Sequence, residues 1–277
     1  MDPARWSEKA ADSNIKGRFE EMLGRAAYRL AAQPRLRQLM FNALRLDRAS
    51  VRPLQRMDEV RFLSYAFGNA GRSHAQIMQD LWVCHELGEA RNGYFVEFGA
   101  TDGRTNSNTA LLERELGWTG LLAEPNPVWH EALARNRMCA IDRRCVAHRG
   151  GETVEFLAVD EPELGTIAAY AAADHFRTVR QQAPSISVET VSLNDLLIAH
   201  KAPETIDYMS VDTEGSEFDI LSGFDFDRWR VRLFSIEHNN TPNERLLDDL
   251  LARRGYQRVF PEFSQWDGWY RLADTGA

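Results

Sequence analysis

The chain has 277 residues, of which 44% are hydrophobic and 27% are charged, and its formal net charge is −8. This length and apolar content suffice for one well-packed α/β domain with an appendage, and the net negative charge argues against nucleic acid as a partner. The three cysteines are irregularly spaced, which argues against a disulfide framework. The sequence has no signal-peptide pattern and no apolar run of roughly 18–20 residues, which argues against secretion and a transmembrane segment. Together these observations predict a cytoplasmic protein.

The first predicted element is a basic helical arm over residues 1–70. Residues 1–65 carry a net charge of +5, against −13 for the remainder, and apolar residues recur every three or four positions from Ile15 to Leu46. This spacing predicts two amphipathic helices, which Pro34 divides. Because an apolar stripe must be buried, we expect the arm to form a homodimer or to close the substrate cleft, rather than to bind a membrane surface.

Residues 71–277 alternate between strand and helix patterns and are predicted to form a Rossmann-like domain. Strands are predicted over residues 94–98, 119–123, 138–142, 154–159, 187–191, 206–212, 232–237, 256–261 and 269–272. Helices are predicted over residues 75–87, 105–116, 127–136, 193–200, 217–223 and 243–253. This alternation predicts a mainly parallel sheet with helices on both faces, and the last two strands predict an antiparallel hairpin at one edge.

A glycine turn follows the first predicted strand. The turn runs from Gly99 to Gly103 and contains Asp102, and about 20 residues later the next strand ends on Glu124. In such a βαβ unit the turn lets a ligand approach the backbone, and the carboxylate accepts hydrogen bonds from ribose hydroxyls, so the pattern predicts an adenosine-containing ligand. The turn lacks G-x-G-x-x-G and G-x-x-x-x-G-K-[ST], which argues against nicotinamide and flavin enzymes and against ATPases and GTPases.

Two later strands deliver titratable residues to the same edge of the predicted sheet. Asp212 ends one strand, and Glu237, His238 and Asn239 end the next. His238 is suited to act as a general base near neutral pH, with Asp212 orienting the substrate. Alternatively, Asp212, Glu237 and Asn239 supply oxygen ligands for a divalent cation such as Mg²⁺. Glu217 is expected to cap the helix that begins there.

An aromatic cluster lies in the predicted C-terminal hairpin. Aromatic rings stack on the apolar faces of sugars, but in a closing hairpin core packing is the better explanation, and we expect core packing. The cluster comprises Phe260, Phe263, Trp266, Trp269 and Tyr270.

Several ordered motifs together resemble the FkbM family of S-adenosylmethionine-dependent methyltransferases. The resemblance extends from Ser73 to Leu272, and its loosest part is Ser73–Asp80, where His74 stands in place of an expected glutamine. The remaining motifs are Gly93–Gly103, Ser107–Thr109, Gly120–Pro127, Ile206–Glu217 and Ile236–Asn239. Because these motifs match in order, the resemblance is more specific than any one of them.

The resemblance implies a class I methyltransferase (Rossmann-like) fold, with a seven-stranded, mostly parallel sheet in the order 3-2-1-4-5-7-6 and antiparallel strand 7. The helical arm over residues 1–70 lies outside the resemblance. It implies S-adenosylmethionine as the cofactor, with Glu124 on the ribose. Residues implied on the amino-acid side of the cofactor are Glu97, Gly99, Ala100, Asp102, Gly103, Ser107 and Asn108. Residues implied near the adenine are Pro125, Asn126, Asp142, Cys145 and Val146.

The family commonly methylates oxygen atoms, so the resemblance implies O-methyl transfer to a sugar hydroxyl in a polysaccharide, glycolipid or glycosylated natural product. Because a neutral alcohol is a poor nucleophile, its proton must leave with the help of a base or a metal ion. Two other functions stay open. A nicotinamide-dependent Rossmann enzyme is disfavoured by the missing third glycine, and a non-catalytic adaptor is disfavoured by the acids at four strand ends.

Overall fold

The structure, a computed structural model, describes residues 33–35, 38, 39, 41, 42, 53, 56–158, 165–170 and 184–273. The chain divides into two compact units, Met1–Arg61 and Phe62–Ala277. Most of the helical pattern predicted from Ile15 to Leu46 lies outside the described residues, so the two arm helices stay predictions.

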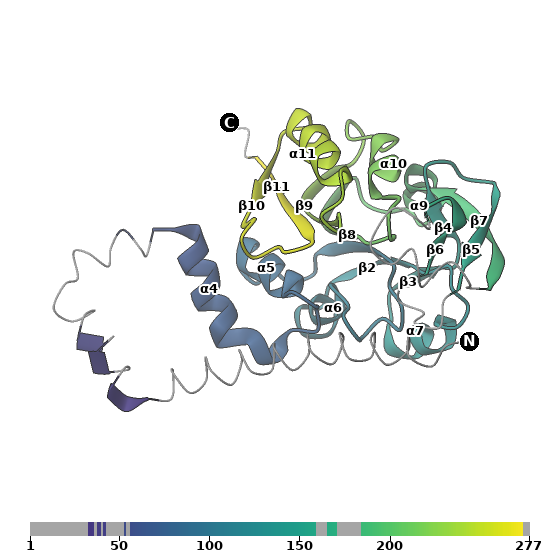
Figure 1. The fold of residues 1–277 in the computed structure, drawn as a ribbon. Coiled ribbons are helices and arrows are strands. Elements are labelled where there is room, and N and C mark those ends of the chain that lie inside the picture. Colours follow the sequence, from purple (N-terminus) through teal and green to yellow (C-terminus); the bar gives the residue numbers. More distant parts are fainter. Residues whose placement is uncertain are drawn as a thin grey trace, which may run out of the picture. The chain divides into compact units, whose positions relative to one another are not determined.

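A seven-stranded sheet forms the centre of the second unit (Figure 1). Across the sheet the strands are β3 (Ala140–Asp142), β2 (Thr119–Ala123), β1 (Tyr94–Phe98), β8 (Thr205–Val211), β9 (Arg230–Glu237), β11 (Asp267–Leu272) and β10 (Tyr256–Val259). Numbered along the chain within this sheet, the order is 3-2-1-4-5-7-6.

The pairing within this sheet is mixed. β3, β2, β1, β8 and β9 pair in parallel, whereas β11 is antiparallel to both β9 and β10. The expectation of a mostly parallel sheet is corrected to a mixed one, because the C-terminal hairpin β10–β11 returns the chain against the direction of β9.

Helices cover both faces of the sheet (Figure 1). On one face lie α9 (Leu193–Ala199), α10 (Glu217–Ser222) and α11 (Asn243–Arg253). On the other lie α4 (Asp58–Asn69), α5 (Gln79–Glu86), α6 (Ala110–Leu116) and α7 (His130–Asn136). Phe62 and Ala66, in the segment that the sequence assigns to the arm, are buried in the core on this second face. Among the described residues, no helix has both the length and the apolar character to cross a membrane.

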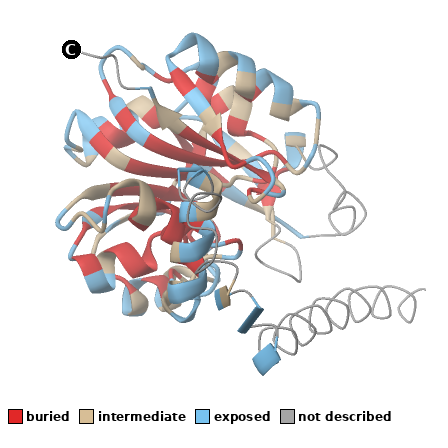
Figure 2. Ribbon diagram, turned by 90° about the vertical axis from the view of Figure 1, so that its left-hand side faces the viewer, coloured by how far each residue is buried: buried red, intermediate tan, exposed pale blue. Residues whose placement is uncertain are grey.

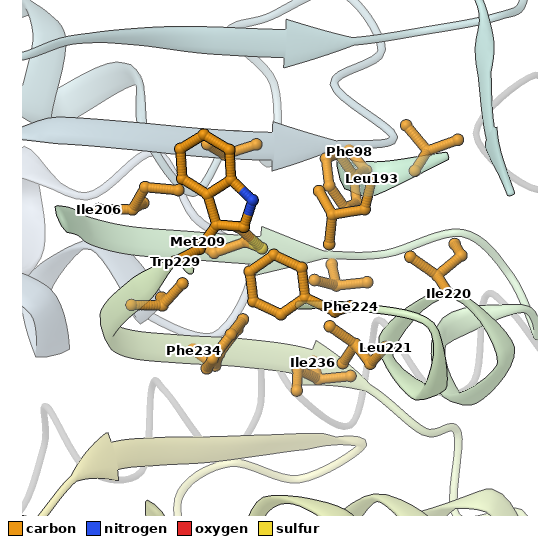
Figure 3. Close-up of a cluster of buried hydrophobic side chains, with 14 of the residues drawn as sticks. Phe98, Leu193, Ile206, Met209, Ile220, Leu221, Phe224, Trp229, Phe234 and Ile236 are labelled. Atoms are coloured by element: carbon orange, nitrogen blue, oxygen red, sulfur yellow. The ribbon is translucent and has the colours of Figure 1, made fainter. Parts of the chain in front are cut away.

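Alternating strand residues build the two halves of the core. Val96 and Phe98 of β1 pack against α9 and α10, whereas Phe95 packs on the opposite face. Figure 3 shows the first cluster, in which Trp229 and Phe224 lie over the apolar residues of β8 and β9. Buried residues follow the strands and the inner sides of the helices (Figure 2), and each large apolar side chain buried in this way stabilises the fold by about 1.5–3 kcal/mol.

A second, four-stranded sheet was not expected from the sequence. Its order is β4 (Cys145–Ala147), β7 (Ser185–Ser192), β5 (Thr153–Leu157) and β6 (Thr166–Ile167). Two short 3-10 helices are η1 (Ala70–Arg72) and η3 (Ala168–Tyr170). The strands predicted over 154–159 and 187–191 exist, but they pair with each other rather than extending the main sheet. β4 and β6, with three and two residues, are too short to give a periodic pattern.

The C-terminal aromatic cluster packs in the core, as expected. Phe260, Trp269 and Tyr270 are buried, and Phe263 and Trp266 are partly buried. The rings of Trp269, in β11, and Trp82, in α5, are stacked with their centroids 5.1 Å apart. These rings therefore stabilise the fold.

Candidate active site

The predicted site residues gather where the parallel strands end. The chain leaves β1 between β2 on one side and β8 on the other, so the loops after these three strands diverge from a common edge. Open α/β sheets bind ligands at such an edge, outside the carboxyl ends of the strands.

The glycine turn after β1 requires its glycines. Gly99 and Gly103 have φ of 67° and 72°, in the left-handed region, and Thr101 between them has φ of 46°. A Cβ on Gly99 would lie 2.2 Å from the carbonyl oxygen of Asp212, and one on Gly103 would lie 2.5 Å from Leu133. The turn is therefore closely packed against the loop after β8, and larger residues at either position would displace it.

The carboxylate of Glu97 is occupied by protein partners. It accepts hydrogen bonds from Ser107 Oγ at 3.1 Å, from the amide of Asn108 at 2.8 Å and from Thr109 Oγ1, and it lies 3.5 Å from the guanidinium of Arg137. Arg137 also donates to Ser107 and Thr109, at 3.1 and 2.8 Å. Glu97 thus orders the segment that leads into α6. Sequence reasoning missed Arg137, because no motif marks a single arginine after α7.

Glu124 is buried between two backbone amides. Its Oε2 accepts from Thr101 N at 2.9 Å and its Oε1 from Asn126 N at 2.7 Å. Burial raises its pKa to about 7, although both amide bonds oppose the shift. Each oxygen keeps a lone pair for a further donor. Pro125 lies between Glu124 and Asn126, and its fixed φ restricts the backbone where the chain leaves β2.

Two buried polar atoms, one after β1 and one after β2, have no hydrogen-bond partner among the described residues. Asn108 donates through Nδ2 to Ser210 Oγ at 2.9 Å, but its buried Oδ1 has no hydrogen-bond partner among the described residues. The buried Nδ2 of Asn126 also lacks a partner in the described part of the chain. Because buried polar groups are nearly always paired, this acceptor and this donor point to a ligand.

The carboxylates of Asp102 and Asp142 both accept hydrogen bonds from protein groups. Asp102 accepts from the amides of Arg104 and Thr105, each at 2.7 Å, and so closes the turn. Burial would raise the pKa of Asp142, but bonds from Arg144 and His200 outweigh it and lower this pKa to about 2. Asp142 is therefore a persistent negative charge at the end of β3.

The other predicted residues near this edge are apolar in character. Ala100 is buried, and its amide lies 3.4 Å from the carbonyl oxygen of Ala123. Cys145 and Val146 are buried in β4, and burial raises the pKa of the Cys145 thiol to about 12. These residues can form an apolar border but supply no charge.

Three carboxylates converge beyond β8 and β9. Asp212, Glu214 and Glu237 each place one carboxylate oxygen within 4.8 Å of the others. Burial, and then the charges of Asp267 and Glu217, raise the pKa of Asp212 to about 7. Burial and the charge of Asp212 raise the pKa of Glu237 well above its ordinary value. Such a cluster can hold either protons or a cation.

Glu217 and Asp267 flank this cluster in fixed positions. Glu217 Oε1 accepts from the amides of Thr213 and Gly215, both at 2.9 Å, so, contrary to the expectation from the sequence, it closes the loop before α10 rather than capping the helix. Asp267 Oδ2 accepts from Gln79 Nε2 at 2.8 Å. Both carboxylates are bound to protein donors, and burial raises the pKa of each, that of Asp267 to about 7.

His238 does not face the carboxylate cluster with a free nitrogen. Its side chain is fully buried, Nδ1 accepts from the amide of Asn240 at 3.1 Å, and Nε2 lies 3.2 Å from the guanidinium of Arg258 and 3.7 Å from Glu244. Burial lowers its pKa. This environment does not suit the predicted general base, since both ring nitrogens contact protein groups. Asn239 follows with φ of 49°.

Comparison with known proteins identifies the kind of site. The family model described as "Methyltransferase FkbM domain" matches residues 97–267, more than half of the chain. No curated protein matches the sequence.

Solved structures resemble the chain only at low identity. Precorrin-6y C5,15-methyltransferase from Geobacter metallireducens GS-15 shares 9% identity over 69% of this chain and 84% of that chain, with a TM-score of 0.37. The N-terminal domain of human METTL16, in complex with SAH, shares 14% identity over 70% of this chain and 68% of that chain, with a TM-score of 0.35. These values are too low to support an inference about this chain.

Proposed function

The chain belongs to the FkbM methyltransferase family, and from this membership we propose that it transfers a methyl group from S-adenosylmethionine to a hydroxyl group of a sugar. The sugar would be part of a polysaccharide, a glycolipid or a glycosylated natural product. One observation carries the proposal: the glycine turn, Glu124 and the carboxylates of Asp212 and Glu237 meet at one edge of the sheet. No observation favours the nicotinamide enzyme or the adaptor.

The residues around the turn fit S-adenosylmethionine. Glu124 offers lone pairs to ribose hydroxyls. Within the described part of the chain, Nδ2 of Asn126 and Oδ1 of Asn108 have no partner, so the first offers a donor to the adenine side and the second an acceptor to an ammonium group. When bound, the cofactor supplies an electrophilic methyl group.

The protein must hold the acceptor hydroxyl in line and help its proton to leave. Asp212 is suited to this task, because its carbonyl packs against the turn at Gly99 and its pKa of about 7 allows a carboxylate at neutral pH. We therefore assign orientation of the hydroxyl to Asp212, with Glu237 beside it. We do not assign the base role that the sequence suggested for His238, because both of its ring nitrogens contact protein groups.

The test is methyl transfer to a panel of saccharides. Purified protein is incubated with methyl-labelled S-adenosylmethionine and with each saccharide, and the O-methylated form of the same saccharide serves as the matched control. We expect label only in the acceptor with a free hydroxyl. Asp212→Asn should reduce turnover by about 100-fold or more while S-adenosylhomocysteine still binds. Binding of NAD without binding of S-adenosylhomocysteine, or full activity of Asp212→Asn, would contradict the proposal.

A further inference from the structure

Asp212, Glu214 and Glu237 are brought together by strand register. β8 and β9 are parallel neighbours, and Val211 pairs with Ile236, so the next residues along the two strands are Asp212 and Glu237. Glu214 follows two residues after Asp212 with φ of 59°, in the loop whose amides at Thr213 and Gly215 donate to Glu217. The three carboxylates therefore come from two adjacent strand ends, and the loop that carries two of them is fixed.

One oxygen of Glu237 lacks a partner. Glu237 is 9% exposed, and its buried Oε2 has no hydrogen-bond partner among the described residues. A buried carboxylate oxygen normally accepts hydrogen bonds or binds a metal ion. Since this carboxylate belongs to the converging set, an ion bound by the three carboxylates would supply the missing partner.

The spacing of the oxygens suits a divalent cation. Mg²⁺ binds oxygen at about 2.0–2.1 Å, so two ligands on opposite sides of the ion are about 4.2 Å apart. Neighbouring ligands of the same octahedron are about 2.9 Å apart. The three oxygens lie within 4.8 Å of one another, so small side-chain rotations bring them to such distances around one ion. Hard cations of this class prefer oxygen ligands, and water or a substrate hydroxyl completes their coordination.

We propose that Asp212, Glu214 and Glu237 form a divalent-cation site that binds the acceptor hydroxyl beside the cofactor turn. This set replaces the one suggested by the sequence, because Glu214 takes the place given to Asn239. The site itself is independent of the reaction, whereas its role in catalysis rests on the proposed function.

The cation would make the hydroxyl a better nucleophile by lowering its pKa. In the transfer, the hydroxyl O–H bond breaks and the proton passes to solvent. The new O–C bond forms as the S–C bond of the donor breaks, and S-adenosylhomocysteine leaves. The contact between Gly99 and the carbonyl of Asp212 keeps the cation site and the cofactor turn adjacent.

Cation binding is measured first without any acceptor. The full chain, stripped with a chelator and dialysed, is titrated with Mn²⁺ while the electron paramagnetic resonance signal of free Mn²⁺ is recorded, and Mg²⁺ is then added as a competitor. We expect one site per chain that Mg²⁺ competes for. The absence of Mn²⁺ binding at millimolar concentration would overturn the proposal.

Variants test whether these carboxylates are the ligands. Glu237→Gln and Asp212→Asn should each weaken Mn²⁺ binding by more than about tenfold, because each replaces a charged carboxylate ligand with a neutral amide while the shape of the side chain stays nearly unchanged. Asp267→Asn is the matched control, because it removes a neighbouring buried charge that is bound to Gln79, and it should weaken binding by no more than about threefold. Retained binding of S-adenosylhomocysteine shows that each variant is folded. Equal losses in all three variants would indicate a general field effect and overturn the site.

The two proposals fail in different ways. Methyl transfer that continues undiminished in chelator would reject a catalytic cation and leave the proposed function standing. Specific Mn²⁺ binding without methyl transfer to any saccharide would leave the cation site standing and reject the proposed acceptor class.

Discussion

Glu97 and Glu124 are buried at the ends of adjacent strands, but different groups compensate their charges. Glu97 has a buried cation, Arg137, within 3.5 Å, together with three hydrogen-bond donors. Glu124 has only the amides of Thr101 and Asn126. The charge on Glu124, the carboxylate proposed to bind the ribose, is therefore sensitive to pH near neutrality.

This difference predicts pH-dependent cofactor binding. Hydroxyl donors favour the ionised carboxylate, and the pKa of Glu124 is raised to about 7, so S-adenosylhomocysteine should bind about tenfold more tightly at pH 8 than at pH 6. Isothermal calorimetry at both pH values measures this change. Glu124→Gln cannot ionise, so it should bind more weakly and lose this part of the pH dependence. An unchanged pH profile in the variant would show that another group titrates.

A second prediction concerns Arg137. Arg137→Met should destabilise the protein by about 3–5 kcal/mol, because it leaves Glu97 and Glu113 buried without their cation. Urea unfolding measures the loss. Arg135→Met, in the last turn of α7 just before Arg137, is the control, since the ion pair of Arg135 with Glu131 is exposed, and it should cost less than about 0.5 kcal/mol. Similar costs for the two variants would refute the role assigned to Arg137.

Site residues that directly follow a predicted strand can be identified from the sequence. Glu124 and Asp212 are found because a strand pattern precedes each of them. Arg137 and Glu214 are not found, because one follows a helix and the other lies inside a turn. His238 has the right position in the sequence, but the direction of its side chain depends on α11 and β10, which the local pattern does not specify.

Among the elements, the segment Ser73–Met78 closes the fold beside the glycine turn. Ala75 forms a parallel bridge with Asn106 in the loop after that turn. The buried carboxylate of Asp80 accepts from Ser73 Oγ at 2.6 Å and from the amide of His74 at 2.8 Å. A single aspartate thus fixes the whole segment at the start of α5.

Loss of this carboxylate should loosen the segment. Asp80→Ala leaves the part-buried donors of Ser73, His74 and Ala75 without their acceptor, so we expect a loss of about 2–3 kcal/mol in the free energy of unfolding. Weaker binding of S-adenosylhomocysteine should accompany it, because the bridge between Ala75 and Asn106 supports the cofactor loop. Ser73→Ala removes one of these bonds and should cost about 1 kcal/mol. If Asp80→Ala were no more costly than Ser73→Ala, the segment would not depend on this carboxylate.

Long apolar strands and amphipathic helices could be predicted at this scale, and short elements could not. The predicted bounds of β1, β2 and α11 agree with the structure at both ends. Helices α6 and α7 begin three to five residues later than predicted, because the loop residues before them have compositions that helices also tolerate. The second sheet depends on pairing between distant segments, such as Cys145 with Thr190, which no local period reveals.

For the whole molecule, the division into two units predicts what a truncated protein retains. The described residues assigned to the cofactor and the cation lie between Glu97 and Glu237, within the second unit. A fragment from Asp58 to Ala277, which keeps α4 intact, should therefore fold and bind S-adenosylhomocysteine as the full chain does.

The same fragment tests the predicted arm. Its mass by light scattering should be that of a monomer, whereas the full chain should be a dimer, because the sequence predicts an apolar stripe that needs a partner surface. Equal association states of the fragment and the full chain, together with full activity, would show that the arm serves neither dimerisation nor the cleft.

The close approach of Gly99 to the carbonyl of Asp212 has a thermodynamic consequence. Because the two loops touch through their backbones, a ligand that orders one loop reduces the entropy that the other must lose on binding. The occupancies are then linked, and linkage is reciprocal: the factor by which S-adenosylhomocysteine tightens Mn²⁺ binding must equal the factor by which Mn²⁺ tightens S-adenosylhomocysteine binding. An enzyme with this coupling fills both sites together at concentrations where either ligand alone would bind weakly.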